Sequence, residues 1–237
     1  MDLIDFIYNK FVSLLKLYSN MALTCNCPLG AALADIPIST CPEGFGQVQK
    51  VAFQRLYNNG VKNKITAPTT LASWTALLSA VNGTKVTISP FINGPTTEAG
   101  AARTYGSGNE VLGGIPINIG REATTFTSNL LQQPADIIKV LKDYQCEQVG
   151  VYLFDENGKI GCLCDDLDSP TEYYPIPIHS LFVGDRTLGG YESLDMNVLS
   201  WSFAPNWSDM LVKVSPTDFN PLYDLATPVA ATTTSGS

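Results

Sequence analysis

Apolar and polar side chains alternate along residues 48–57, as they do in a β-strand that buries one face. Val48 and Phe53 are apolar, whereas Lys50 and Arg55 are charged. The dipeptide Asn59-Gly60 follows, and both residue types accept the positive φ angles that a tight turn requires. The sequence therefore predicts a β-hairpin in this region.

Two later segments carry apolar residues at helical spacing. Residues 70–81 place five apolar side chains on one helical face and are followed by the stop signal Asn82-Gly83. Residues 134–144 begin with Pro134, which suits a first helical turn. The apolar positions are Leu71, Trp74, Leu77, Leu78 and Val81 in the first segment and Ile137, Ile138 and Leu141 in the second. The sequence predicts two short helices.

The segment QVGVYLFDENGKIGCLCDD, residues 148–166, holds two apolar runs joined by a turn sequence that ends in Asn157-Gly158. This pattern predicts a second β-hairpin. Further strands are expected at residues 173–183, 198–203 and 210–214. Pro175 and Pro177 restrict the first of these to a sheet edge or a bulge, because proline cannot donate a ladder hydrogen bond.

Residues 83–129 differ in composition from the segments on either side. These 47 residues contain six charges and many glycines and threonines, and they show no helical apolar stripe. Aromatic and β-branched residues such as Tyr105 and Ile117 argue against plain disorder. Long loops that persist in compact domains usually bind something. We expect residues 83–129 to form an extended arm that becomes ordered by contact with copies of the same protein.

The two ends of the chain differ from the rest. Residues 1–40 are expected to be an N-terminal extension with an amphipathic helix, since apolar residues recur at helical spacing between Leu3 and Tyr18. Asp2 and Asp5 interrupt this stretch, which disfavours a signal peptide or a membrane span. Met21 is a second plausible start, so residues 1–20 are either a docking helix or an upstream extension. Residues 226–237 form a low-complexity tail.

The remaining residues, 41–225, are expected to form one domain of α+β class that is mainly β, with two short helices and the long arm. The net charge of −8 disfavours sequence-independent binding to nucleic acid, because no cluster of Lys and Arg is present to neutralise phosphates. Six cysteines are too few for a disulfide scaffold in a domain of this size.

The sequence offers no convincing catalytic, cofactor-binding or metal-binding constellation. The single histidine, His179, lies in an apolar stretch without a nucleophile motif, which favours a structural or surface role. The pairs Cys25/Cys27 and Cys162/Cys164 lack the usual spacing of zinc ligands, so buried free thiols are favoured. The acidic residues at 165–172 lack the spacing of an EF-hand loop and are interpreted as a solvated loop.

Several runs resemble virion structural proteins of tailed phages and prophages, and among these the major tail or tail-tube type. The resemblance covers residues 41–222 and rests on the overall order of residues, not on one short motif. The runs are CPEGFGQVQKVAFQRLY, GPTTEAGAARTYGSGNEVLGGIPINIGREATTFT, GVYLFDENGKIG, YYPIPIHSLFVGDRTLGGYE and LSWSFAPNWSDMLVKVSPTDFNPL.

This resemblance implies a β-sandwich or β-barrel core with a flanking helix, assembled in six-fold rings that form a tube for passive transit of genome DNA. It also implies a virion location, other virion proteins as partners and no membrane association. The arm residues expected at the interface between copies are Thr97, Arg103, Tyr105, Asn109 and Phe126. The acidic residues that could line the lumen are Asp155, Glu156, Asp165 and Asp166.

Two alternatives stay open at this point. The first keeps the chain in the virion as a capsid-decorating or head-to-tail connector protein. The second is a secreted carbohydrate-binding or adhesive module that uses exposed aromatic residues, for which Tyr173, Trp201 and Trp207 are the candidates. An enzymatic function is the least favoured. With one histidine and no catalytic motif, a pair of carboxylates is the only catalytic arrangement left, and the sequence does not show which carboxylates would form it.

Overall fold

A computed structural model describes residue 36, residues 44–106 and residues 108–226. The predicted N-terminal helix and the tail after residue 226 lie outside the described residues. The described residues from Gly44 onward belong to one compact unit. Its helical elements are α2 (Leu71–Leu78), α3 (Ala135–Asp143), η1 (Gly108–Glu110), η2 (Leu112–Gly114) and η3 (Tyr144–Cys146).

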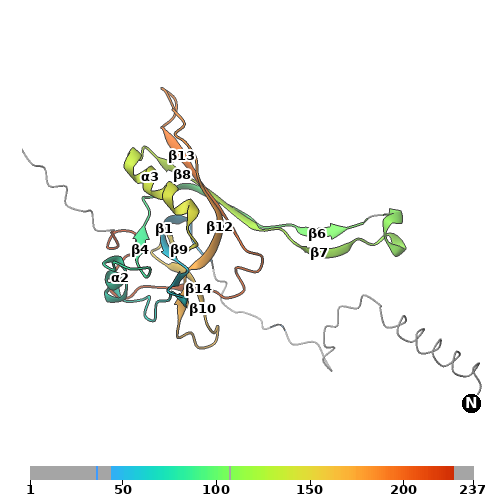
Figure 1. Cartoon of the computed structure of the whole chain (residues 1–237), viewed down its shortest axis with the longest axis horizontal. Coiled ribbons are helices and arrows are strands. Elements are labelled where there is room, and N and C mark those ends of the chain that lie inside the picture. Colours follow the sequence, from blue (N-terminus) through green and yellow to red (C-terminus); the bar gives the residue numbers. More distant parts are fainter. Residues whose placement is uncertain (1–35, 37–43, 107, 227–237) are drawn as a thin grey trace, which may run out of the picture. The chain divides into compact units, whose positions relative to one another are not determined.

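Fourteen strands occupy the described residues, and ten of them form one main sheet (Figure 1). The first eight are β1 (Val48–Arg55), β2 (Tyr57–Asn58), β3 (Val61–Lys62), β4 (Val86–Ile88), β5 (Asn93–Glu98), β6 (Ala102–Tyr105), β7 (Ile117–Arg121) and β8 (Thr124–Leu131). The others are β9 (Val149–Asp155), β10 (Ile160–Cys164), β11 (Tyr173–Tyr174), β12 (Ile176–Val183), β13 (Met196–Phe203) and β14 (Leu211–Val214). The pairs β2–β3 and β6–β7 are separate ladders.

Strand β9 connects the two halves of the main sheet. Along one edge it pairs with β1 over its whole length, and β1 also pairs with β4. Its other edge is divided, because Phe154 and Leu153 pair with β10 whereas Val151 and Gly150 pair with β12. From β12 the sheet continues through β13 and β8 to β5. All these pairings are antiparallel.

Successive residues of β1 and β9 point into two different hydrophobic cores. Val51 and Phe53 of β1 and Val151 of β9 join side chains of β8, β12, β13 and α3 in one cluster, which we call the intersheet core. Ala52 of β1 and Tyr152 of β9 join α2, β10 and the residues around Leu222 in the other, which we call the α2 core. Both faces of β9 are therefore covered, and every residue of this strand is buried.

Helix α2 is fixed to the sheet by Trp74. The indole packs edge-on against Tyr152 and Phe154, with ring centroids 5.1 and 5.7 Å apart, and its Nε1–H donates to the Pro68 carbonyl at 2.9 Å. The helix ends at Leu78, earlier than predicted, and Val81 is fully exposed instead of facing inward. The amide of Ala80 bonds to Leu77 O in a tightened last turn, which turns the chain away before Val81.

Helix α3 agrees with the prediction. Pro134 precedes its first residue, Ile138 and Leu141 are buried in the intersheet core, and Ile137 is half-buried against the same cluster. Asp136 lies in the first turn and Lys142 in the last, which is the arrangement that complements the helix dipole.

The predicted hairpin at residues 48–63 is only partly correct. Asn59 and Gly60 adopt the expected positive φ angles of 50° and 80°, and they join β2 to β3. These strands have two residues each, however, and β1 pairs with β9 and β4 instead of folding back on its own continuation. The long-range partner is preferred because it buries both faces of β1.

The predicted hairpin at residues 148–166 is confirmed as β9 and β10, and Gly158 in its turn has a φ angle of 75°. The strand expected at residues 173–183 is confirmed as β11 and β12, but β12 lies between β9 and β13 and is not an edge strand. Its pairing with β13 shifts register between His179 and Phe182, as at a bulge. Pro177 pairs with β9, and the pairing with β13 begins only at Ile178, so the missing amide of Pro177 interrupts no ladder with β13. Strands β13 and β14 match the remaining predictions.

The class α+β, mainly β, is confirmed. Five strands that lie in or begin in residues 83–129 were missed at the sequence level, although β8 buries Phe126, Ser128 and Leu130 at every second position. Residues 83–129 are therefore not one irregular arm, because β4, β5 and β8 belong to the main sheet.

Replacing Gly158 by valine tests the turn between β9 and β10. A β-branched residue at a positive φ angle costs about 1–2 kcal/mol, so we expect the free energy of unfolding to fall by that amount. Urea denaturation measures the change. Gly44→Val is the matched control, because no atom lies within 4 Å of a Cβ added there. Equal midpoints for the two variants would contradict the turn geometry.

Candidate functional site

The most distinctive surface is a β-hairpin that extends away from the main sheet (Figure 1). Strands β5 and β8 pair within the sheet up to Glu98 and Thr125, and the chain then continues outward as the β6–β7 ladder. We call residues 101–122 the projecting hairpin. Every residue of β6 and β7 is exposed. The arm predicted to need neighbouring copies for its order thus has a backbone ladder of its own.

The two faces of the projecting hairpin differ in polarity. Tyr105 lies opposite Ile117 in the ladder, so their side chains share one face, and Ile115 falls on that face by the two-residue period of extended backbone. Thr104 and Asn118 form the opposite, polar face. The exposed fractions of Tyr105, Ile115 and Ile117 are 60%, 73% and 56%, which leaves this apolar face uncovered.

Close backbone contacts determine the shape of the projecting hairpin at its base and its tip. A Cβ on Gly100 would lie 1.9 Å from the Glu122 carbonyl oxygen, so only glycine fits where the hairpin leaves the sheet. At the tip, Gly106 has a φ angle of 75°, and a Cβ there would lie 2.5 Å from a methyl group of Val111.

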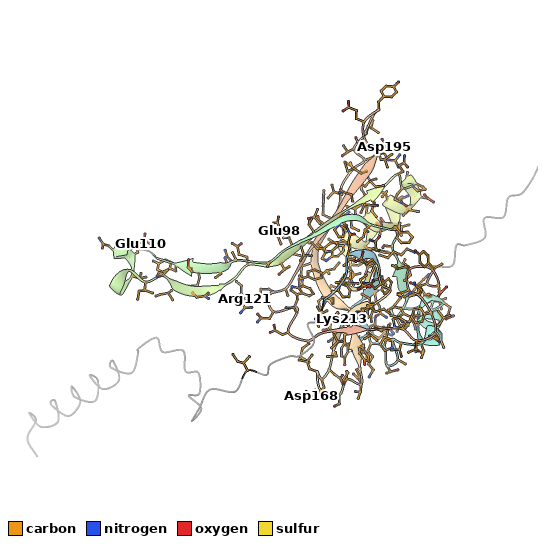
Figure 2. All side chains as sticks on the ribbon, turned by 180° about the vertical axis from the view of Figure 1, so that it is seen from behind. Glu98, Glu110, Arg121, Asp168, Asp195 and Lys213 are labelled. Carbon is orange, nitrogen blue, oxygen red and sulfur yellow. The ribbon has the colours of Figure 1, made fainter. Side chains whose placement is uncertain are left out.

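Arginines lie on both faces of the projecting hairpin. Arg103 is paired with Gly120 and lies on the side of Tyr105, whereas Arg121 is paired with Ala102 on the other side. Neither guanidinium has a hydrogen bond or ion pair with the part of the chain that the structure describes. In Figure 2, Glu98 marks the end of β5 in the main sheet, Arg121 lies near the base of the hairpin and Glu110 at its tip.

The structure separates the five residues predicted for the arm interface. Arg103, Tyr105 and Asn109 lie on the projecting hairpin and are exposed. Thr97 is exposed at its base, in β5. The prediction for Phe126 is wrong, because only 2% of the residue is exposed and its ring stacks on Trp201 at a centroid distance of 4.2 Å. Phe126 stabilises the subunit and is not available to a neighbour.

The prediction that Asp155 lines a lumen is also wrong. Its carboxylate is fully buried and accepts hydrogen bonds from the backbone amides of Gly46, Asn157 and Lys159 at 3.0, 2.9 and 2.7 Å. It therefore holds the β9–β10 turn and cannot line a lumen. Glu156, next to it, is exposed.

Asp165 and Asp166 begin the exposed loop that follows β10. The Asp165 carboxylate accepts the Thr171 hydroxyl at 2.6 Å and the amides of Thr171 and Glu172 at 3.0 Å each. These bonds, the Thr171 hydroxyl first, lower the pKa of Asp165 below its usual range. Asp166 accepts the amide of Asp168 at 2.9 Å.

The exposed acidic residues predicted for the lumen lie at opposite ends of β10. Glu156 precedes the strand and Asp165 follows it. Five residues of strand span roughly 17 Å, so the acidic residues at its two ends lie about that far apart. A channel wall that included both would have to run along β10.

The cysteines of β10 behave as core residues. Cys162 is fully buried in the α2 core, where desolvation raises the pKa of its thiol to about 12. Cys164 is buried as well, while Cys25 and Cys27 lie outside the described residues. No group of three or more potential metal ligands occurs in residues 44–106 and 108–226. His179 is exposed on β12 and pairs with Ser202 of β13.

The aromatic residues considered for carbohydrate binding are not an exposed platform. Trp201 is buried in the intersheet core, and Trp207 is half-buried, with its ring stacked on Phe203 at a centroid distance of 4.3 Å. Tyr173 is half-buried against the α2 core. The structure therefore contradicts the premise of that alternative.

A second exposed apolar feature was missed at the sequence level. The connection between β12 and β13 carries three exposed apolar residues, Leu188, Tyr191 and Leu194. Asp195, labelled in Figure 2, accepts the Gly189 amide at 3.0 Å and closes this turn. The apolar residues in the run TLGGYESL were a signal for it. We call residues 185–195 the β12–β13 turn.

Among the helices that the structure describes, none has the length and apolar character needed to cross a membrane.

No family model and no curated protein matches the chain. Among solved structures, it is similar to a chain from the tail of an empty gene transfer agent particle with C6 symmetry and to one from the virion of a native gene transfer agent. Both are 12% identical with a TM-score of 0.30, and the match covers 52% of this chain and 82% or 85% of theirs.

A chain from the six-fold symmetrised baseplate of the anti-feeding prophage is also similar. It is 11% identical with a TM-score of 0.31, and the match covers 75% of this chain and 98% of that one. TM-scores of this size do not establish a shared fold.

Replacing Asp165 by asparagine tests the loop after β10. Because the pKa of Asp165 is lower in the folded protein than in the unfolded chain, its stabilising contribution is present at neutral pH and is lost as the pH falls below about 4. We expect Asp165→Asn to lower the melting temperature at pH 7 and to have a smaller effect at pH 3. Asp168→Asn in the same loop is the control, and an equal effect of Asp165→Asn at both pH values would contradict this role.

Proposed function

We propose that this chain is a structural subunit of a phage-like virion tail, with no enzymatic activity, and that copies of it assemble into a ring or tube through the projecting hairpin. Its partners are copies of itself and other virion proteins. The observation that carries the proposal is the uncovered apolar face formed by Tyr105, Ile115 and Ile117.

An exposed apolar face of this kind favours association. Full burial of one isoleucine or aromatic side chain contributes about 1.5–3 kcal/mol, and this hairpin offers several within one short ladder. The polar face, with Thr104 and Asn118, can stay in water when the apolar face is covered. An element with one face for a partner and one for solvent fits a contact between subunits.

The ladder of the projecting hairpin lowers the cost of such a contact. Its backbone hydrogen bonds form within the chain, and Gly100 and Gly106 fix its base and tip. A partner therefore does not have to order a flexible loop on binding, and more of the burial energy appears as affinity. This supports a preformed arm in place of one that folds on contact.

In the assembled state we propose that genome DNA passes through the tube without being held. A channel that carries a polyanion avoids Lys and Arg, since each phosphate contact would slow transit. Glu156, Asp165 and Asp166 are the exposed acidic residues proposed for the channel wall. Because they lie at both ends of β10, this strand would run along the channel.

Substitutions on the two faces of the projecting hairpin test the assembly. We expect Tyr105→Ser combined with Ile117→Ser to raise the concentration at which the protein assembles by about 30-fold, because buried interface side chains contribute roughly 2 kcal/mol or more. Sedimentation velocity measures the assembly, and electron microscopy shows whether the wild-type particles are rings or tubes. A wild-type protein that stays monomeric at every concentration would overturn the proposal.

The control for this experiment is Thr104→Ser combined with Asn118→Ser on the polar face, which should assemble as the wild type does. A shortened variant tests whether the subunit folds without the hairpin. The Ala101 carbonyl accepts the Glu122 amide at 2.9 Å, so Asn-Gly in place of residues 102–121 closes a two-residue turn. Its melting temperature should match that of the wild type.

Charge reversal tests the proposed channel wall. We expect assemblies of Glu156→Lys or Asp166→Lys to retain duplex DNA at low salt and to release it as salt rises, because added lysines bind phosphates. Fluorescence anisotropy of labelled DNA measures retention. Glu192→Lys on the β12–β13 turn is the matched control, and equal DNA retention by all three variants would remove the two residues from the channel.

A further inference from the structure

An apolar groove of about 420 Å³ lies beside α3. Ile137, Val140 and Leu141 of the helix form one wall, and Pro90 and Tyr223 contribute from other segments. Val140 is 48% exposed and Tyr223 72%, so large apolar surface is left uncovered in the described subunit. The volume is within the range of about 300–1,000 Å³ over which pockets bury whole ligands, and it suits a few side chains.

The lining of the groove includes one cation, Lys50, and one anion, Asp136, and only the cation already has a partner within the described subunit. Lys50 donates to the Leu222 carbonyl at 2.5 Å and lies 4.2 Å from the centroid of the Phe91 ring, so its charge is already engaged within the subunit. Asp136, in the first turn of α3, takes part in no hydrogen bond or ion pair with residues 44–106 and 108–226. An occupant with an apolar face and one positive charge would match this groove.

The projecting hairpin has this chemistry. Tyr105 and Ile117 are exposed on one face, and Arg103 is on the same side with no partner in the described residues. The β12–β13 turn is the other exposed apolar feature, but it fits less well. It carries Glu192, and its own arginine, Arg186, already donates to the Gln133 carbonyl.

The other cavities in the described part of the chain lack an unpaired anion, because Glu147 in two of them is paired with Arg55 and Asp185 in another is paired with Lys142. The cavity at the base of the hairpin, lined by Pro95, Thr97 and Trp207 among others, has no charged residue in its lining. The cavity at the far side of α3 is lined by Lys139, Lys142 and Arg186, which would repel Arg103. The groove beside Asp136 combines apolar walls with an anion that is not yet paired.

The hairpin of the same subunit does not reach this groove. Both views show β6 and β7 leaving the main sheet on the side away from α3 (Figures 1 and 2). A contact between hairpin and groove therefore joins two copies. Because it uses two different surfaces, each copy can give its hairpin to one neighbour and receive that of another. Such head-to-tail contacts generate closed rings or open filaments.

We infer that the projecting hairpin of one copy docks in the groove beside α3 of the next copy, with Tyr105 and Ile117 against Val140 and Ile137, and Arg103 paired with Asp136. This inference rests on the proposed self-assembly and names the receiving surface. The contact is apolar at its centre and has one ion pair, a composition typical of specific interfaces.

A charge exchange tests this pairing. Arg103→Asp and Asp136→Arg should each raise the assembly concentration at least about tenfold, because each places like charges together. The double variant restores opposite charges and should assemble within about threefold of the wild type. Arg121→Asp on the polar face is the matched control and should have little effect. Sedimentation velocity measures all four, and melting curves report whether each variant is folded.

A cross-link tests proximity independently of charge. When Ile117→Cys and Val140→Cys proteins are mixed and oxidised, a disulfide-linked dimer should form that neither protein gives alone, which also controls for the native cysteines.

Two results would overturn the inference. In the first, Asp136→Arg assembles as the wild type does, which is the result expected if residues 227–237 of the same chain filled the groove. In the second, the single variants assemble poorly, the double variant does not restore assembly and no cross-link forms. In both cases, assembly of the wild type would still support the proposed function. Failure of the wild type to assemble would instead remove the proposed function itself.

Discussion

Burial of β9 on both faces is the constraint on which the rest of the subunit depends. Val151 on one side and Tyr152 on the other belong to different cores, and each core needs its own cover. The intersheet core is closed by β12, β13, β8 and α3, and the α2 core by Trp74 and the residues around Leu222. Because β9 also divides one of its edges between β10 and β12, it determines the directions in which both halves of the sheet extend.

This arrangement gives the projecting hairpin a rigid base. Strand β8 is anchored by Phe126 and Leu130 in the intersheet core, and β5 follows it as far as Glu98. Beyond that point no core is available, so the side chains of β6 and β7 stay exposed and the apolar ones gather on a single face. Strands β5 and β8 thus serve the fold, whereas β6 and β7, which continue from them, carry the surface that we propose for contact.

The proposed assembly uses two surfaces that the subunit cannot pair internally. The hairpin points away from α3, whose groove carries apolar walls and the anion of Asp136. A head-to-tail contact between them leaves each subunit with one surface of each kind for its neighbours, which is the requirement for a ring or tube. The acidic residues at both ends of β10 are not part of this contact, so they stay available for the proposed channel wall.

Local signals in the sequence were sufficient for both helices, for the β9–β10 hairpin with its glycine turn and for the mainly β class, because each depends on periodicity or on the φ preference of a few neighbouring residues. The sparsely charged stretch at residues 83–129 also marked the region of the candidate site. Only the tertiary structure decided that Phe126 and Asp155 are internal and that Arg103 and Tyr105 are exposed. It also decided that β1 pairs with β9 and not with its own continuation. Strand pairing and burial depend on contacts between residues far apart in the chain. The local pattern of a segment does not specify which distant segment packs against it.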